Sequence, residues 1–296
     1  MMEVLTDAAV RGSIVALLAV GLTLVQGTLR FANIAHVEFA TLGAYGAAAL
    51  TGAGLTLWAG SVLSIAGVAS FSVVLYRVVF RRLLASGPMI ALIGALAVGI
   101  IARALLQFVF GSRPLKLPVP LSRGMSIGDA TVTPNQIRLV VIAVVLLVLT
   151  LAVLRWTQLG RAIRAVAADP DLAEVSGLNR ARIADMLWLV SAGLAGAAGI
   201  LLAMDSAVAP ELGFNLLLPV FAAAIVGGLG SVAGAIVAAY AIALAEALIL
   251  RIDFGSFVDG FGYIAVSYRP AVGFVLLVAM LALRPQGLMG KAVRRG

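Results

Sequence analysis

The chain has 296 residues, of which 62% are hydrophobic and only 11% are charged, whereas an ordinary soluble domain has roughly 25% charged residues. Its formal net charge of +8 comes from 21 basic and 13 acidic residues, and it contains one histidine and no cysteine, which excludes a disulfide framework, thiolate catalysis and a Cys/His metal cluster. The composition predicts an all-α polytopic membrane protein with no metal site and no cofactor.

Apolar runs separated by short polar breaks make up most of the chain. Because about 20 mainly apolar residues cross a hydrocarbon core of about 30 Å, we expect about 8 to 10 transmembrane or half-spanning helices in a single membrane domain covering residues 1–296. The N-terminal sequence MMEVLTDAAVRG lacks the basic stretch and cleavage site of a signal peptide, so the first apolar run is expected to remain as a span. The candidate segments are 8–29, 33–50, 55–76, 88–110, 136–154, 183–204, 214–226, 231–250 and 270–283.

Basic residues gather in three clusters, which the positive-inside rule assigns to the cytoplasm. The other loops balance basic with acidic residues, as is typical of external loops, and this distribution disfavours nucleic acid as a partner. It predicts an external N-terminus, a cytoplasmic C-terminus and a Pro- and Gly-rich external loop at about 111–135 that caps the outer mouth. The clusters are Arg77, Arg81 and Arg82; Arg155, Arg161, Arg164, Arg180 and Arg182; and Arg284, Lys291, Arg294 and Arg295.

The first polar break inside an apolar region is the sequence NIAHVE at 33–38. A charged side chain at the bilayer centre costs at least about 2.5–3.5 kcal/mol, so such residues usually face a cavity or a partner. Asn33 is a candidate N-cap with His36 on the same helix face, whereas Glu38 lies roughly 200° around the helix from His36. One interpretation is a lining for an amino-acid zwitterion, with the helix N-terminus facing its carboxylate and Glu38 its ammonium group. The alternative is that Arg30, His36 and Glu38 pair with one another or lie near the cytoplasmic interface.

Other polar residues stand alone in apolar segments. Arg103 and Gln107 lie one helical turn apart within 88–110, and Glu246 lies near the end of 231–250. Arg103 could pair with Glu246 or with Glu38, and the sequence leaves both open. For Glu246 the simpler expectation is that its side chain snorkels to the interface.

A polar insert, RWTQLGRAIRAVAADPDLAEVSGLNRAR, covers residues 155–182 between two apolar stretches. Asp169 and Pro170 are typical of an N-cap and a first helical residue, and Gly177 of the residue just past a helix end. A helix of about two turns is marginal in water and needs something to pack against. Lipid headgroups are one candidate, but the acidic residues Asp169, Asp171 and Glu174 favour a soluble protein partner.

The second break follows the apolar segment 214–226, whose 13 residues are too few to cross the bilayer. The sequence GGLGS comes next, and its backbone amides could face a carboxylate at a helix start or could form a tight structural turn. Two broken segments in opposite halves predict a central pathway. The residues of this second break are Gly227, Gly228, Gly230 and Ser231.

Four segments resemble the LivH/LivM-type permeases of branched-chain amino acid ABC importers and are closer to the LivH half. They are GLTLVQGTLRFANIAHVEFATLGAYGA (21–47), LGRAIRAVAADPDLAEVSGLN (159–179), AAAIVGGLGSVAGAIVAA (222–239) and RPQGLMGK (284–291). The resemblance implies a multi-pass protein of the bacterial inner membrane that pairs with a second, LivM-like permease, two cytoplasmic ATPases and a periplasmic binding protein. It also implies that the polar half-helix start carries over onto Asn33, His36 and Glu38, and that the ATPase-contacting loop carries over onto Gly160, Arg161, Arg164, Asp169, Ala173, Glu174, Gly177 and Leu178.

The chain departs from the family pattern at two positions, where it has Gln26 instead of the frequent Tyr and Val37 instead of the frequent Gly. Both flank the polar cluster, so the exact substrate stays open. GGLGS does not match the phosphate loop GxxxxGK[ST], and the resemblance implies a transport subunit that is not itself an enzyme. Three other interpretations remain: a urea or short-amide permease or channel, a secondary transporter with Glu38 as its ion-coupling acid, and a receptor-like scaffold.

Overall fold

The computed structural model describes residues 1–120, 124–127, 130–251, 269–283 and 287–289, and almost all of the elements in these ranges are helices. Within these ranges, six helical stretches are long and apolar enough to cross a membrane, which confirms the prediction of an all-α polytopic membrane protein. They are Met2–Leu29 (α1), Leu57–Ala85 (α3, Leu57–Leu75, with its continuation), Pro88–Phe110 (α5), Pro134–Trp156 (α6), Arg180–Asp205 (α9) and Val232–Ile249 (α11).

Shorter elements lie between the long helices. Among the described residues, two of the shorter helices are preceded by a 3₁₀ turn: η1 (Ile34–Val37) precedes α2 (Glu38–Gly52), and η3 (Phe214–Leu216) precedes α10 (Leu217–Gly227). Helix α12 covers Arg269–Leu283, and the polar insert contains α7 (Gln158–Ala168) and α8 (Pro170–Val175). Two short strands, β1 (Met125–Ile127) and β2 (Ala130–Val132), pair antiparallel with Met125 opposite Val132.

One predicted boundary is wrong. The helix that was expected to end at Tyr76 continues through a π-helical turn, η2 (Tyr76–Phe80), into α4 (Arg81–Ala85). Hydropathy falls there because Arg77, Arg81 and Arg82 enter the sequence, but arginine is a good helix former and the backbone stays helical. The basic cluster 77–82 is therefore part of a helix and not of a loop.

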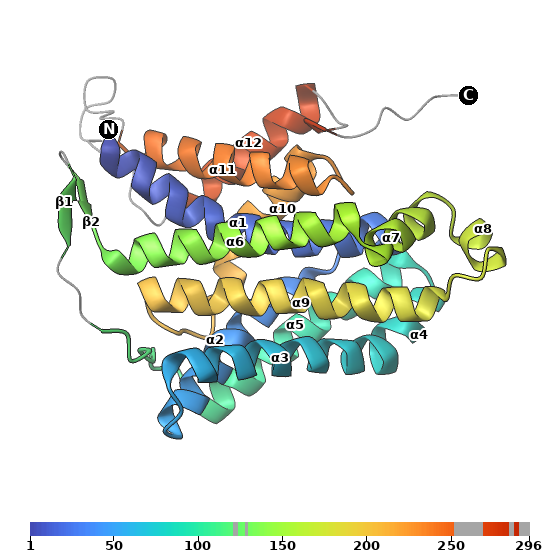
Figure 1. Cartoon of the computed structure of the whole chain (residues 1–296), viewed down its shortest axis with the longest axis horizontal. Coiled ribbons are helices and arrows are strands. Elements are labelled where there is room, and N and C mark those ends of the chain that lie inside the picture. Colours follow the sequence, from blue (N-terminus) through green and yellow to red (C-terminus); the bar gives the residue numbers. More distant parts are fainter. Residues whose placement is uncertain (121–123, 128–129, 252–268, 284–286, 290–296) are drawn as a thin grey trace.

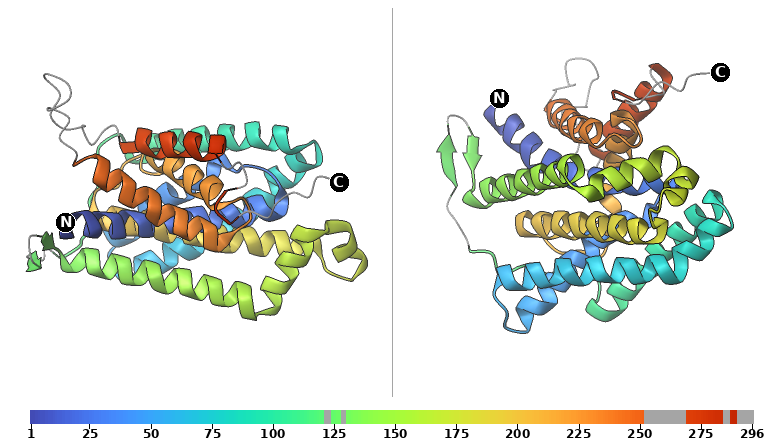
Figure 2. Two further views of the ribbon diagram at one scale, coloured as in Figure 1. Left: turned by 90° about the horizontal axis from the view of Figure 1, so that it is seen from above. Right: turned by 45° about the vertical axis from the view of Figure 1, so that its right-hand side comes forward.

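The long helices pack around α1 and α9. Helix α1 contacts α11, α9 and α6, while α9 also contacts α2 and α3. In Figure 1, α6, α9 and α3 run side by side along the long axis, with the β1–β2 hairpin at one end and α7 and α8 at the other. Figure 2 shows the same separation of the hairpin from α7 and α8 in its first view.

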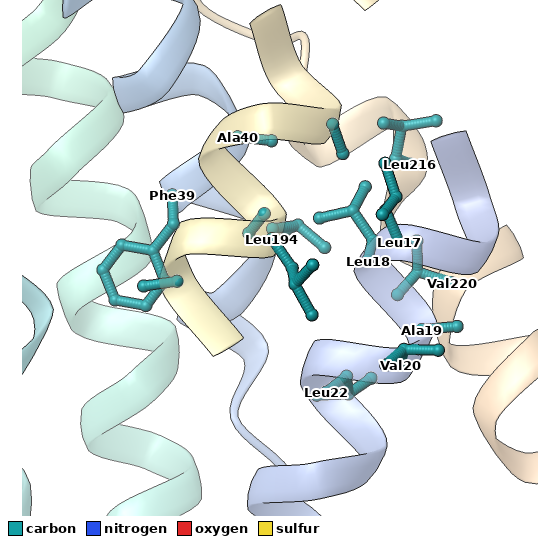
Figure 3. Close-up of a cluster of buried hydrophobic side chains, with 14 of the residues drawn as sticks. Leu17, Leu18, Ala19, Val20, Leu22, Phe39, Ala40, Leu194, Leu216 and Val220 are labelled. Atoms are coloured by element: carbon teal, nitrogen blue, oxygen red, sulfur yellow. The ribbon is translucent and has the colours of Figure 1, made fainter. Parts of the chain in front are cut away.

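Burial divides the helices into a centre and a periphery. The apolar window of α1 is 89% buried and that of α9 is 72% buried, whereas the windows of α5 and α6 are each 22% buried. Figure 3 shows the buried centre, where Leu17 and Leu18 of α1 meet Leu194 of α9, and Leu216 and Val220 lie beside them. Most of the exposed side chains of α5 and α6 are apolar, as expected for helices that face lipid, and the exposed arginines Arg138 and Arg155 lie near the two ends of α6.

The loop predicted at 111–135 is tied to the connection that follows α9. Leu115 and Val208 exchange two backbone hydrogen bonds of 2.9 and 2.8 Å. The loop ends in a capping box, in which Thr133 accepts from the backbone of Gln136 and the Gln136 side chain accepts from the backbone of Thr133. Residues 121–123 and 128–129 of this loop, and the basic cluster of Arg284, Lys291, Arg294 and Arg295, lie outside the described residues.

Candidate functional site

The first helix break falls where the sequence predicts it. Helix α1 ends at Leu29, and Arg30 takes a left-handed conformation (φ 56°) while its N–H donates to the carbonyl of Gln26 at 3.0 Å. The chain is then non-helical as far as Asn33, and the helix that follows the 3₁₀ turn η1 begins only at Glu38. Non-helical backbone at membrane depth is tolerated where protein covers it.

An aromatic cluster covers this non-helical backbone, and the sequence patterns did not predict it. Trp188 of α9, which is 1% exposed, lies at its centre. The ring centroids of Phe31, Phe39, Tyr76 and Phe80 lie 6.4, 6.2, 5.4 and 4.8 Å from that of Trp188. Within its own segment, no aromatic residue forms part of a pattern that predicts a cluster. The packing of α9 against α2 and η2 brings these residues together.

His36 joins three elements in the interior. Its side chain is completely buried, its Nε2 lies 3.1 Å from the carbonyl oxygen of Leu18, and its Nδ1 lies 3.2 Å from Oγ of Ser191. Ser191 in turn donates to the carbonyl of Gly21 at 2.9 Å. These bonds connect η1 to α1 and α9.

Asn33 occupies the N-cap position of η1, but its side chain makes no capping hydrogen bond. The residue is 1% exposed, and neither polar atom of its side chain has a hydrogen-bond partner among the described residues. Contact of Asn33 or His36 with a substrate stays a prediction.

Glu38 lies at the centre of a polar network at the start of α2. Its Oε1 accepts from Nη2 of Arg103 at 2.5 Å, and its Oε2 accepts from Thr41 at 3.3 Å. Thr41 Oγ1 also accepts from the backbone N–H of Gly213 at 2.9 Å, and the Arg103 guanidinium lies 4.1 Å from the ring centre of Phe214. Of the two partners left open for Arg103, the structure selects Glu38. Among the described residues, the side chains of Glu38 and His36 have different hydrogen-bond partners, as their angular separation predicts.

Glu246 does not snorkel, so that expectation is wrong. It is 1% exposed, and its Oε2 accepts from Nε of Arg11 at 2.8 Å. The antiparallel packing of α1 against α11 places an arginine of one helix beside the glutamate of the other. A third buried acid, Asp185 of α9, pairs with Arg77 at 2.7 Å.

The second helix break is a compact glycine turn. Helix α10 ends at Gly227, and Gly228 and Gly230 take positive φ angles of 100° and 86°. Ser231 then caps α11 by accepting from the backbone of Gly234 at 3.1 Å. The N–H of Gly228 donates to Ile225 and that of Ser231 to Gly228, at 3.0 and 2.9 Å, so these two amides are already used within the turn. A contact between this turn and a substrate carboxylate stays a prediction.

The glycine turn and the network around Glu38 make different contacts. Gly230 lies against Gly27 near the C-terminal end of α1, and a cavity of about 500 Å³ connects the turn to Gly160 and Arg164 of α7. The network around Glu38 instead touches Gly213 and Phe214, at the start of the η3–α10 segment. The structure therefore joins the first break to the beginning of the second broken segment, and the glycine turn to the polar insert.

The polar insert contains two helices where the sequence predicted one. The predicted helix is α8: the Asp169 side chain accepts from the backbone of Asp171 and Leu172 at 3.0 Å each, and Gly177 has a φ of 86°. The additional helix, α7, has a buried apolar face formed by Ile163 and Val166. That spacing of three residues was the available signal for it.

The predicted coupling residues differ in burial. Gly160 and Ala173 are buried, whereas Arg161, Arg164, Asp169, Glu174 and Gly177 are exposed and Leu178 is half-buried. Gly160 lies against the carbonyl of Leu154, to which the Arg164 side chain also donates. On α8, Leu172 and Val175 are 64% and 87% exposed, so this short helix carries an apolar surface that the chain itself does not cover.

Two basic clusters share one end of the molecule. Helix α4, with Arg81 and Arg82, lies at the same end as α7 and α8 in Figure 1. A cleft of about 1080 Å³ at this end is lined by Arg30, Arg81, Glu174 and Arg180, together with other residues. Arg180 also pairs with Asp171 and Glu174, at 3.2 and 3.5 Å.

Discontinuous helices that meet inside a lipid-facing bundle are typical of membrane transporters, and this is the class that the fold and site define. Residues 4–281 match the family described as branched-chain amino acid transport system / permease component. The chain is 30% identical over 295 residues to the high-affinity branched-chain amino acid transport system permease protein LivH of Escherichia coli K12, covering 95% of this chain and 92% of LivH. It is 31% identical over 296 residues to the corresponding protein BraD of Pseudomonas aeruginosa PAO1, with the same coverage. The chain therefore belongs to this family of permease components.

The fold is also similar to a more distant solved structure, PsaBC from Streptococcus pneumoniae in complex with Fab. The TM-score is 0.50 at 14% sequence identity, and the match covers 96% of this chain and 92% of the other. At this identity the similarity concerns the fold alone.

Proposed function

We propose that the chain is a permease subunit of an ABC importer that moves branched-chain or related amino acids across the bacterial inner membrane. The family match and the names of the LivH and BraD relatives support the substrate class. The chain is a single permease domain, with an external loop at about 111–135, a cytoplasmic ATPase-coupling loop at about 155–182, an external N-terminus and a cytoplasmic C-terminus. Its partners are cytoplasmic ABC ATPases, a LivM-like permease, a periplasmic substrate-binding protein and the lipid around α5 and α6.

The observation that carries this proposal is the exposed apolar surface of α8. Leu172 and Val175 point away from the chain's own core at the end that holds two basic clusters, which suits a soluble partner on the cytoplasmic side. ATP binding closes the ATPases, α8 transmits their displacement, and the broken segments rock so that access alternates. In this mechanism the coupling contacts are made by Gly160, Arg161, Arg164, Asp169, Ala173, Glu174, Gly177 and Leu178, and the pathway is bordered by Asn33, His36, Glu38, Gly227, Gly228, Gly230 and Ser231.

The pairing of Glu38 favours nucleotide-driven transport over ion coupling. An ion-coupling acid has to bind and release a cation during each cycle, but Glu38 already accepts from Arg103 and Thr41. Glu246 and Asp185 are likewise engaged by arginines. These three buried acids offer no free counter-charge for a proton or a sodium ion.

Reconstitution with the ATPases, the second permease and the binding protein tests the proposal. Leucine uptake into proteoliposomes is expected to require ATP and binding protein. Replacing the two exposed α8 residues (Leu172→Ser with Val175→Ser) should weaken ATPase association at least about tenfold, because apolar anchors dominate interface energies. The control Ala53→Ser changes an exposed residue between α2 and α3, outside the polar insert, and should leave association unchanged.

Several outcomes would contradict the proposal. Uptake driven by a proton or sodium gradient without ATPase would identify a secondary transporter, and uptake without ATP or binding protein would identify a channel. ATP-dependent uptake of urea but not leucine would replace the substrate class and keep the coupling mechanism. Tight binding of a soluble partner with no solute movement would identify a scaffold.

A further inference from the structure

Three separate stretches of the chain meet around the buried side chain of Glu38, and Phe214 at the edge of this meeting point is 46% exposed. Arg103 comes from α5, Glu38 and Thr41 come from the first turn of α2, and Gly213 and Phe214 come from the start of the η3–α10 segment. Two links join the broken segments to each other. One is the direct hydrogen bond from Gly213 to Thr41, and the other is the Arg103 side chain, which pairs with Glu38 and stacks on Phe214.

The two broken segments approach each other so closely at Gly213 that no side chain fits between them. A Cβ atom on Gly213 would overlap the carbonyl oxygen of Val37 and the hydroxyl of Thr41. The two backbones therefore touch where α2 and α10 begin. Close backbone approach of this kind gives van der Waals packing, which replaces the hydrophobic effect between helices in lipid.

The ion pair between Arg103 and Glu38 adds an electrostatic cost to separating these segments. The side chain of Glu38 is 3% exposed and that of Arg103 is 24% exposed. Separating a buried pair leaves each charge in a poorly solvated environment, at a cost that a membrane interior increases. The connection is therefore expected to persist while the helices around it move.

A second ion pair has nearly the same environment but joins different elements. Arg11 and Glu246 are 22% and 1% exposed, and they connect the continuous helices α1 and α11. Loss of either pair removes one arginine–glutamate interaction of similar burial. Of the two arginines, Arg103 is the one that contacts both broken segments, through Glu38 of α2 and the ring of Phe214. A comparison of the two pairs therefore separates a general stability effect from an effect on translocation.

We propose that Arg103 is a positioning residue for translocation, which fixes the starts of α2 and α10 to each other so that both broken segments move as one unit between the inward-open and outward-open states. This inference rests on the proposed function, because it assigns a role within the nucleotide-driven cycle. Arg103 acts through Glu38 and Phe214 and need not touch the substrate.

The first test compares Arg103→Gln with the matched control Arg11→Gln in the reconstituted importer. Arg103→Gln is expected to lower leucine imported per ATP hydrolysed at least about tenfold, whereas Arg11→Gln should leave that ratio within about twofold of the native value. An equal ratio in the two variants would overturn the inference. Failure of the native complex to import leucine would contradict the proposed function instead.

The first measurement of the second test keeps Arg103 in place and so does not depend on the folding of a variant there. The chain has no cysteine, so spin labels can be placed at Ala49→Cys on α2 and Leu218→Cys on α10, both exposed. With Arg103 intact, the label-to-label distance distribution measured by pulsed electron resonance should be the same in the nucleotide-free and ATP-trapped complexes. A distance that changes between the two states would overturn the inference. With Arg103→Gln added, the distribution should become broad or state-dependent, and an unchanged distribution would also overturn it.

Discussion

Single glycines decide how closely the central helices approach. Gly43 of α2 faces Gly196 of α9, and a Cβ atom on Gly199 would overlap the backbone carbonyl of Ala40. Between helices in lipid, association depends on van der Waals contact, so a small residue at the crossing contributes more than its own surface suggests. Because α2 carries Glu38 and α9 carries Ser191 and Trp188, these glycines also set the position of the polar network and of the aromatic cluster.

We predict that Gly199→Ala lowers the melting temperature of the detergent-purified protein. The added methyl group meets backbone that cannot move without separating α2 from α9, and overpacking of this kind costs about 1–3 kcal/mol. Gly67→Ala on α3 is the control, because a Cβ atom there meets nothing within 4 Å. Alanine is the better helix former, so the control should be neutral or slightly stabilising. Equal melting temperatures for the two variants would contradict the close approach.

At the scale of the element, the stability of helix α8 depends on the capping contacts at its two ends. It has 6 residues, far fewer than an isolated helix needs in water. Asp169 satisfies two backbone amides at its start, and Gly177 allows the left-handed turn just past its end, where the N–H of Leu178 returns to the carbonyl of Ala173 at 3.0 Å. These contacts hold Leu172 and Val175 in the exposed position that the coupling role requires.

Gly177→Asp is expected to abolish ATPase association while membrane insertion stays intact. An aspartate in the left-handed region is strained by roughly 1–2 kcal/mol, which is enough to displace a helix of 6 residues. Gly54→Asp is a control with the same strain, since Gly54 has a φ of 98° and open space around it between α2 and α3. The measurement is the amount of ATPase that co-purifies with each variant. Normal association of the Gly177 variant would refute the coupling assignment.

At the scale of the whole molecule, charge and shape differ between the two ends of the bundle. Helices α4, α7 and α8 and two basic clusters lie at one end, and the β1–β2 hairpin lies at the other (Figure 1). Basic residues near span ends are retained on the cytoplasmic side. The proposed orientation therefore makes the hairpin end external and the α8 end cytoplasmic.

Cysteine labelling tests this orientation, because the native chain contains no cysteine that would react. Met2→Cys and Glu174→Cys place thiols at exposed positions near the N-terminus and on α8. A membrane-impermeant maleimide should label Met2→Cys in intact spheroplasts and Glu174→Cys only after permeabilisation. The reverse pattern would place α8 outside and would contradict both the orientation and the coupling role.

Much of the architecture follows from local sequence. Hydropathy and length predicted each apolar segment, and both helix breaks were recognised from polar or glycine-rich interruptions at 30–38 and 227–231. The caps of α8 were also predictable, because Asp169 and Gly177 act on their own neighbours in the chain. The extension of α3 into α4 and the helix α7 were missed, because charged residues lower hydropathy without stopping a helix.

The sequence by itself determined the apolar segments, the two breaks and the caps of α8, because hydrophobicity, capping and backbone freedom act within a few residues. Only the tertiary structure decided that Arg103 pairs with Glu38, that Arg11 neutralises Glu246, and that aromatic residues of several elements enclose the first break. The two members of the first pair lie 65 positions apart in the chain, and those of the second pair 235. A buried charge must find a partner, but which partner it finds depends on which helices pack together, and that is a property of the whole bundle.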